Sequence, residues 1–194
     1  MFFKNYLYPF LFGLVGIFAF APFSIKPLIF VSYFYLINSL ITTKKNFSQI
    51  LSWGIGHWSF GMSWIIVSIY YYGNVSFIGS LLLFLILSIV CIIFFFLPIL
   101  LLKRVIINKS NNLLLLVPFV LILVELGRYY FLGGFPWLLP GYIFLDTPYE
   151  NLYGLIGVSG LSLLLYLFVT ANVALYSNKT FLLAFNSFLL ISFL

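Results

Sequence analysis

The sequence predicts an all-α, polytopic integral membrane protein with six full transmembrane helices and a truncated seventh. Of its 194 residues, 64% are hydrophobic and only 6% are charged, whereas a soluble domain carries roughly 25% charged residues because its surface faces water. The few charges separate long apolar runs. Because lipid offers the backbone no hydrogen-bond partner, such runs cross a membrane as helices. We therefore expect one transmembrane domain over residues 1–194 and no soluble domain.

Seven apolar segments approach or reach the length of a membrane span, which is about 20 residues at about 1.5 Å rise each. Their predicted bounds are about 5–20, 25–42, 48–71, 76–102, 112–131, 151–176 and 180–194. The first segment is short and is stopped by Pro22, and Pro98 is expected to kink the end of the fourth. The last has only fifteen residues, so we expect the chain to end inside an incomplete seventh helix.

The basic residues predict how these helices are oriented. With a cytoplasmic N-terminus, seven basic residues fall on the inner side and two on the outer side, as the positive-inside rule requires. The inner set is Lys4, Lys44, Lys45, Lys103, Arg104, Lys109 and Lys179, and the outer pair is Lys26 and Arg128. We therefore expect loop 132–150 on the periplasmic side of a bacterial inner membrane. The basic residues are scattered and do not form a patch, which argues against nucleic acid as a partner.

The outer loop 132–150 is the most informative stretch of the chain. It is long, apolar and aromatic, and its glycines and prolines forbid a continuous helix. Irregular backbone at membrane depth survives only where protein covers it or where it lines a cavity. We therefore expect this loop either to be covered by protein, in a structural role, or to line a substrate groove, with Trp64 from the outer half of the segment 48–71 as a further wall. The candidate groove residues are Trp64, Phe135, Pro136, Trp137 and Tyr142.

Glu125 and Arg128 lie three residues apart near the outer end of the predicted helix 112–131. This spacing puts both on one helix face, where they can pair. A single charge at mid-bilayer costs about 2.5–3.5 kcal/mol on insertion scales, so both are expected to face the bundle. In one interpretation they form a structural pair that anchors the helix end and the aromatic loop. In the other, Arg128 offers its guanidinium fork to a lipid phosphate.

Packing explains the other conspicuous residues better than chemistry does. Two stripes of small residues in the segment 48–71 have the spacing of helix contact faces; they are Ser52, Gly56, Ser59 and Ser63, and Gly54, Gly61 and Ser68. His57 is expected to be an interhelical hydrogen-bond partner, and Trp53 and Trp58 to be membrane-belt or groove residues. Cys91 has no base nearby, as a catalytic thiol would need. The residues therefore predict no catalytic centre, no metal site and no cofactor.

Six short strings occur in a fixed order along the chain. They are Phe20-Ala21-Pro22-Phe23, Trp53-Gly54-Ile55-Gly56 followed by Gly61-Met62-Ser63-Trp64-Ile65-Ile66-Val67-Ser68-Ile69, Glu125-Leu126-Gly127-Arg128, Gly134-Phe135-Pro136-Trp137-Leu138 with Gly141-Tyr142, Asp146-Thr147-Pro148, and Gly157-Val158-Ser159-Gly160. Over about residues 10–170 this pattern resembles the N-terminal membrane domain of bacterial apolipoprotein N-acyltransferases. The chain departs from the family pattern at His57, Gly127 and Tyr129.

The resemblance implies an inner-membrane enzyme that moves an acyl chain from a phospholipid to the N-terminal amine of a diacylglyceryl apolipoprotein. It also implies a Glu-Lys-Cys triad in a periplasmic nitrilase-like domain that covers the Phe-Pro-Trp loop and a lipid groove. Such a domain needs on the order of 200 residues, and the sequence ends at Leu194. We therefore expect a truncated or split form that is inactive alone, or one that a separately encoded nitrilase-like domain completes.

A function from another class stays open on the residues alone. Six helices and an aromatic outer loop would also suit the substrate-binding membrane subunit of a transporter, with the loop as a metabolite pocket. The ordered strings favour the acyltransferase family over this alternative.

Overall fold

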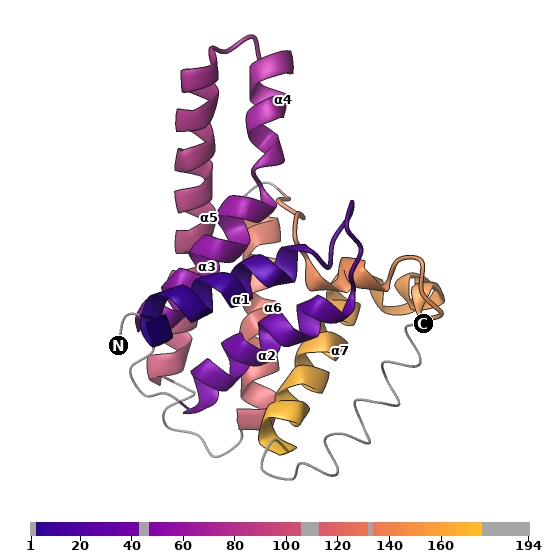
Figure 1. Cartoon of the computed structure of the whole chain (residues 1–194). Coiled ribbons are helices and arrows are strands. Elements are labelled where there is room, and N and C mark those ends of the chain that lie inside the picture. The colour runs from indigo at the N-terminus through magenta and orange to yellow at the C-terminus, as the bar shows by residue number, and fades with distance from the viewer. Residues whose placement is uncertain (1–2, 43–46, 106–112, 132–133, 176–194) are drawn as a thin grey trace.

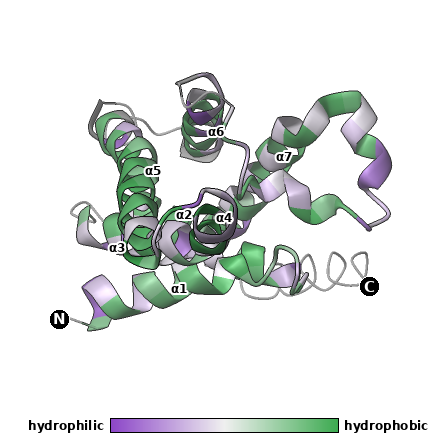
Figure 2. Ribbon diagram, turned by 90° about the horizontal axis from the view of Figure 1, so that it is seen from above, coloured by the Kyte–Doolittle hydropathy of each residue, from purple (hydrophilic) through white to green (hydrophobic). Residues whose placement is uncertain are grey.

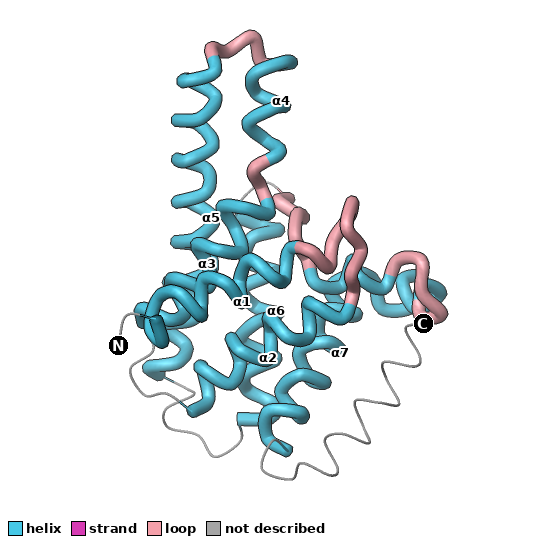
Figure 3. Tube along the Cα trace, viewed as in Figure 1, coloured by secondary structure: helices cyan, strands magenta, loops and turns pink. Residues whose placement is uncertain are grey.

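The computed structural model describes residues 3–42, 47–105, 113–131 and 134–175. Within these ranges the chain is helical and contains no strand (Figure 3). The α-helices are α1 Tyr8–Ile17, α2 Pro27–Thr42, α3 Phe47–Gly61, α4 Trp64–Tyr72, α5 Phe77–Val105, α6 Leu113–Phe131 and α7 Tyr153–Leu175. A π-helical turn, η1 (Phe3–Leu7), precedes α1, and two 3-10 turns, η3 (Pro140–Phe144) and η4 (Glu150–Leu152), lie before α7.

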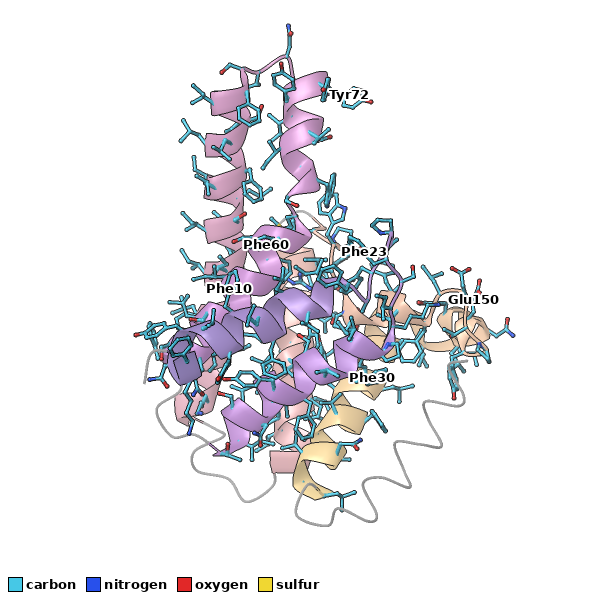
Figure 4. The ribbon with its side chains drawn as sticks, in the orientation of Figure 1. Phe10, Phe23, Phe30, Phe60, Tyr72 and Glu150 are labelled. Atoms are coloured by element: carbon cyan, nitrogen blue, oxygen red, sulfur yellow. The ribbon has the colours of Figure 1, made fainter. Side chains whose placement is uncertain are left out.

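The helices form two regions of different shape. In the first, α1, α2, α3, α6, α7 and the C-terminal half of α5 pack together; we call this region the bundle. In the second, α4 and the N-terminal half of α5 run side by side away from the bundle and join at its far end; we call this region the hairpin (Figure 1). Tyr72 lies at the far end of the hairpin, and Phe60 lies near its foot (Figure 4).

The closest helix packing in the bundle is the crossing of α1 with α3. A methyl group added to Gly13 would overlap the carbonyl oxygen of Trp53, and one added to Gly56 would overlap the carbonyl oxygen of Phe10. His57 Nδ1 lies 3.3 Å from the carbonyl oxygen of Gly13. Small residues let helix backbones approach this closely. The predicted contact role of Gly56 and the interhelical hydrogen bond of His57 are confirmed.

The structure divides the predicted helix 48–71 into α3 and α4. The division falls at Met62 and Ser63, where the backbone changes direction through two turn residues. The Ser63 hydroxyl donates a hydrogen bond of 2.9 Å to the carbonyl of Phe60, the residue three positions earlier. A hydroxyl that binds the preceding turn competes with the helical ladder and bends helices. Apolar residues continue on both sides of the break, and for this reason the sequence pattern predicts a single span there.

Other predicted bounds also change. The first predicted helix, 5–20, ends at Ile17 and is followed by hydrogen-bonded turns that reach Ser24. The predicted helix 180–194 lies outside the described residues.

Trp53 and Trp58 are buried in the bundle, so their predicted places in a membrane belt or groove wall are wrong. They pack against the aromatic interior, with Trp53 stacked on His57 at 4.7 Å between ring centroids.

Two helical stretches in the described part of the chain are long and apolar enough to cross a membrane. They are Phe77–Leu101, with a mean hydropathy of 3.2, and Glu150–Leu175, with a mean hydropathy of 2.0. Figure 2 shows that hydrophobic residues make up most of the length of α5. These two stretches suggest a membrane protein. The prediction of six full spans is not confirmed, because α1, α3 and α4 have only 10, 15 and 9 residues.

The end of the bundle opposite the hairpin is held by a buried lysine. Lys103, near the C-terminus of α5, donates a hydrogen bond of 3.0 Å to the carbonyl of Leu40, near the C-terminus of α2. The last carbonyls of a helix have no partner within it, and a cation there is stabilised by the helix dipole. This contact aligns the ends of α2 and α5 at one level.

Candidate functional site: an aromatic groove at the foot of the hairpin

A groove with a volume of about 610 Å³ runs along α4 and the segment that follows α6. Its lining residues are Trp64, Ile65, Ser68, Ile69, Tyr72, Gly73, Leu87, Phe135 and Trp137. The break at Met62 and Ser63 turns α4 so that its first residue, Trp64, faces this segment. We call this site the aromatic groove.

Three of the predicted groove residues meet at one end of the aromatic groove. The rings of Trp64 and Trp137 lie 5.6 Å apart between centroids, and those of Phe135 and Trp137 lie 4.6 Å apart. Trp64 and Trp137 are half-exposed, while Phe135 is buried behind them. Offset and edge-to-face arrangements of this kind are favourable for aromatic rings. The three rings form a fixed apolar surface with one side open.

The other two predicted groove residues do not line it. Pro136 lies between Phe135 and Trp137 and is partly buried. Tyr142 is in η3, where its backbone N–H donates to the carbonyl of Leu139 at 3.0 Å. The structure brings Trp64 from α4 to the loop, as predicted, but Tyr142 belongs to the part of the loop that packs on α7.

Arg128 supports the groove from inside the bundle. Only 4% of its surface is exposed. Its guanidinium carbon lies 4.4 Å from the ring centroid of Trp58, a cation–π contact. Its Nη1 donates a hydrogen bond of 3.2 Å to the carbonyl oxygen of Trp137. Arg128 therefore connects α3 and α6 to the residue that carries the exposed indole of the groove.

Glu125 makes contacts in a different direction. Tyr166 of α7 donates a hydrogen bond of 3.1 Å from its hydroxyl to Glu125 Oε2, and Ser159 and Ser162 lie on the same side of α7, close to the carboxyl group. No salt bridge joins Glu125 to Arg128 in the described part of the chain. The two residues share a helix face as predicted, but Arg128 holds the aromatic loop and Glu125 holds α7.

The rest of the loop before α7 is fixed by its own contacts. The Gly141 N–H donates to Ser162 Oγ at 2.9 Å, and the Tyr153 hydroxyl donates to the Gly141 carbonyl at 2.6 Å. A side chain at Gly141 would overlap the carbonyl oxygen of Val158. Lys26 Nζ donates to the carbonyls of Leu145 and Asp146, which joins the turn before α2 to this loop. This part of the loop is therefore held in place by its own close contacts and does not depend on contacts in the aromatic groove.

A second, smaller cavity of about 220 Å³ lies on another side of the bundle, between α2, α7 and the 3-10 turns. Its lining residues are Phe30, Phe144, Tyr149, Leu152, Leu161, Leu164, Leu165 and Phe168. Almost all of its surface is apolar. The cavity is therefore an apolar gap between packed elements.

The chemistry of the aromatic groove suits binding rather than bond breaking. Its wall is apolar except for the hydroxyls of Ser68 and Tyr72 at the hairpin side. No three residues of His, Cys, Asp and Glu gather to hold a metal within the described ranges. Cys91 is a buried free thiol in α5 and is not part of the groove lining. Sequence reasoning missed Ser68, Tyr72 and Leu87, because their contribution depends on the break that separates α3 from α4.

Residues 12–171 match the family described as the apolipoprotein N-acyltransferase N-terminal domain. This stretch covers more than half of the chain and contains every residue of the aromatic groove. The chain belongs to this family. Among its relatives, the apolipoprotein N-acyltransferases of Haemophilus influenzae and Pseudomonas syringae pv. tomato are 30% and 36% identical over 160 and 175 residues. That of Haemophilus ducreyi is 32% identical over 174 residues.

These alignments cover 81%, 88% and 87% of this chain but only 30%, 34% and 33% of the relatives. The chain therefore spans about a third of the length of the curated proteins that it matches. The transporter interpretation has no support from these relatives. The resemblance predicted from the ordered strings is confirmed.

Proposed function

We propose that this chain is the membrane domain of an apolipoprotein N-acyltransferase, and that its aromatic groove binds an acyl chain of the phospholipid donor. The groove carries the proposal, because it joins the Phe-Pro-Trp segment to α4 in an open, apolar site. Family membership and the activity for which the relatives are named support the class of reaction. The acceptor in this proposal is a diacylglyceryl apolipoprotein.

The depth of the groove supports a lipid ligand. Leu87 and Phe77 lie sixteen and twenty-six residues before Lys103 on α5, which corresponds to rises of about 24 and 39 Å. A hydrocarbon core is about 30 Å thick, and a whole bilayer about 40–45 Å. With Lys103 at the inner boundary and α5 along the bilayer normal, the groove extends across the outer boundary of the core. Acyl chains meet their head groups at that depth.

The residues along the groove fit such a ligand. Leu87, Phe135 and Trp137 offer apolar surface at its deeper end, and Tyr72 and Ser68 offer hydroxyl groups towards the tip of the hairpin. Indole and phenol rings favour the interface between the hydrocarbon core and the head groups. An acyl chain would lie along the aromatic wall, with its ester end near the hydroxyls.

The proposed topology has six spans, a cytoplasmic N-terminus and the loop 132–150 on the periplasmic side of a bacterial inner membrane. The seven-to-two asymmetry of basic residues supports it. In a Cys91→Ala background, cysteines replacing Asn74 or Asn151 should react with an impermeant reagent from the periplasm. A cysteine replacing Thr42, at the other end of the bundle, should not. The reverse labelling pattern would contradict this orientation.

The group transfer itself belongs to a separate domain in this proposal. Acyl transfer through a thioester needs an activated thiol, and Cys91 is a fully buried thiol inside α5. We expect the purified chain to bind a labelled phospholipid without forming a thioester or acylating a diacylglyceryl peptide. Acyl transfer that disappears on Cys91→Ser would contradict the assignment of catalysis to a nitrilase-like domain.

Photocrosslinking in lipid nanodiscs tests the groove directly. A phosphatidylethanolamine with a diazirine in its acyl chain should label the groove residues more than the exposed aliphatic face of α5. Trp137→Ala and Trp64→Ala should reduce that labelling several-fold. Phe119→Ala is the matched control, because Phe119 is an exposed aromatic residue on α6 outside the groove. Equal loss in the control, or labelling spread evenly along α5, would overturn the proposed lipid site.

A further inference from the structure

Three buried polar atoms from α3 and α6 have no hydrogen-bond partner in the described part of the chain. They are His57 Nε2, Trp58 Nε1 and Glu125 Oε1. The three side chains are 0%, 2% and 3% exposed. Buried polar atoms in folded proteins are almost always paired, since leaving one unpaired costs about 1–3 kcal/mol. A second component must therefore satisfy them.

The three side chains lie near one guanidinium group. Arg128 lies over the ring of Trp58, and Glu125 is three residues before Arg128 on α6. The rings of His57 and Trp58 are 5.7 Å apart between centroids. The unpaired atoms thus belong to one polar cluster inside the bundle, separate from the lining of the aromatic groove.

The donor and acceptor pattern of this cluster identifies the class of ligand. The Trp58 indole can only donate, and an ionised Glu125 can only accept. A carbonyl oxygen can only accept, so the hydrogen bond to Gly13 puts a proton on His57 Nδ1, and Nε2 of the neutral ring is left as an acceptor. One donor and two acceptors match a molecule that accepts once and donates twice. Water has that capacity, and buried water commonly fills this role.

We propose that the cluster of His57, Trp58, Glu125 and Arg128 is an internal water-binding site. Water held there accepts a hydrogen bond from the Trp58 indole and donates to Glu125 Oε1 and His57 Nε2. It also separates the charges of Glu125 and Arg128, which lack a direct salt bridge, while keeping both solvated. The site does not depend on the proposed lipid ligand, and it would persist in a chain that binds no phospholipid.

The indole of Trp53 supplies a matched control for a direct measurement. Trp53 is on the same helix and is fully buried, but its Nε1 donates to Ser32 Oγ at 3.1 Å and lies 3.3 Å from the Ser32 carbonyl. In the ¹⁵N-tryptophan-labelled full chain in nanodiscs, magnetisation transfer from water should reach the Trp58 indole proton several-fold faster than the Trp53 indole proton. Equal, slow transfer to both would overturn the proposal.

Variants of Glu125 test whether the water is shared. Glu125→Gln keeps an acceptor oxygen, so it should preserve the transfer to Trp58. Glu125→Leu removes both acceptor oxygens and should reduce that transfer several-fold while leaving Trp53 unchanged. The Gln variant keeps the test valid if the Leu variant does not fold. Transfer lost in Glu125→Gln, or unchanged in a folded Glu125→Leu, would refute a water bound between Trp58 and the carboxylate.

Discussion

The bundle and the hairpin are built from similarly apolar sequence but are stabilised in different ways. In the bundle, glycines bring α1 and α3 into backbone contact, and buried polar side chains join α2, α3, α5, α6 and α7. In the hairpin, α4 packs mainly against α5, and most of its large side chains are exposed. The exposed apolar side chains of the hairpin therefore need lipid or another partner to cover them, whereas the bundle buries its own apolar core.

This difference accounts for the position of the aromatic groove. Its rigid wall belongs to the bundle, because Arg128 fixes Trp137 from inside. Its other wall is α4, which has few contacts of its own. Segments with few buried contacts open at lower free energy than packed cores. A groove between a fixed wall and a more mobile wall can admit a long ligand, and the following substitutions test how strongly the two regions differ.

The largest expected effect is the loss of Arg128 from the bundle. Arg128→Leu removes the contact with Trp58 and the hydrogen bond to Trp137, and it leaves Glu125 as an uncompensated charge. Leaving a buried charge uncompensated typically costs about 3–5 kcal/mol, and we expect about 3 kcal/mol here because Glu125 and Arg128 lack a direct salt bridge. The measurement is the free energy of unfolding in detergent. Arg128→Lys should fall between the wild type and the Leu variant, because lysine keeps the charge but not the planar fork.

The double variant Arg128→Leu with Glu125→Gln separates structure from substrate binding. If Arg128 is mainly structural, the double variant should recover part of the lost stability, because no unpaired carboxylate remains. Recovery should be incomplete, since the contacts to Trp58 and Trp137 are still missing. A double variant no more stable than Arg128→Leu, together with lost phospholipid binding, would favour the phosphate-binding interpretation of Arg128.

The second largest effect is expected at the crossing of α1 and α3. Gly13→Ala forces a methyl group against the Trp53 carbonyl, where neither backbone can move easily. Overpacking of this kind costs about 1–3 kcal/mol. The matched change in the hairpin is Gly79→Ala, where the nearest atom is Cγ1 of the partly exposed side chain of Val75, at 2.6 Å, and not a backbone atom of a packed helix. Thermal unfolding should show a clear loss of stability for Gly13→Ala and almost none for Gly79→Ala. Equal losses of stability in the two variants would remove the distinction between the two regions.

Apolar runs and proline positions in the sequence were enough to predict most helices. The bounds of α2, α5, α6 and α7 lie within about three residues of those predicted, a normal uncertainty for helix ends. The break between α3 and α4 was missed because apolar residues continue through it. The hydroxyl of Ser63 and the preceding Gly61 are the available signals, but their spacing also fits the stripes of small residues at helix contacts.

The groove was easier to anticipate than the contacts behind it. Trp64, Phe135 and Trp137 could be selected because aromatic residues beside helix breakers suggested a cavity wall. The spacing of Glu125 and Arg128 predicted a shared face, but no local pattern could indicate that Arg128 reaches Trp58 and Glu125 reaches Tyr166. Those partners are distant in sequence, so they follow from helix packing alone.

A smaller effect is expected at the junction between the two regions. Ser63→Ala removes the hydrogen bond to the Phe60 carbonyl while leaving the backbone free to continue as a helix. A hydrogen bond of this kind contributes about 0.5–1.5 kcal/mol, and partial exposure of Ser63 lowers that value. The distance between spin labels at Tyr72 and Phe119 should change, because the angle of the hairpin to the bundle is set here. An unchanged distance would assign the break to packing against the Trp137 segment instead.

The smallest expected effect is an increase in stability, from a substitution at Gly127 in α6. This glycine lies between Glu125 and Arg128, and a methyl group added to it would meet no atom within 4 Å. Alanine is favoured over glycine in a helix by up to about 1 kcal/mol, because the unfolded chain loses less freedom on folding. We therefore expect Gly127→Ala to raise the unfolding free energy slightly, the opposite sign to the same substitution at Gly13. Trp137 fluorescence should stay unchanged, since Arg128 keeps its contacts. A destabilised Gly127→Ala variant would mean that the outer end of α6 needs backbone freedom, and that the fixed wall of the groove is less rigid than its contacts with Arg128 indicate.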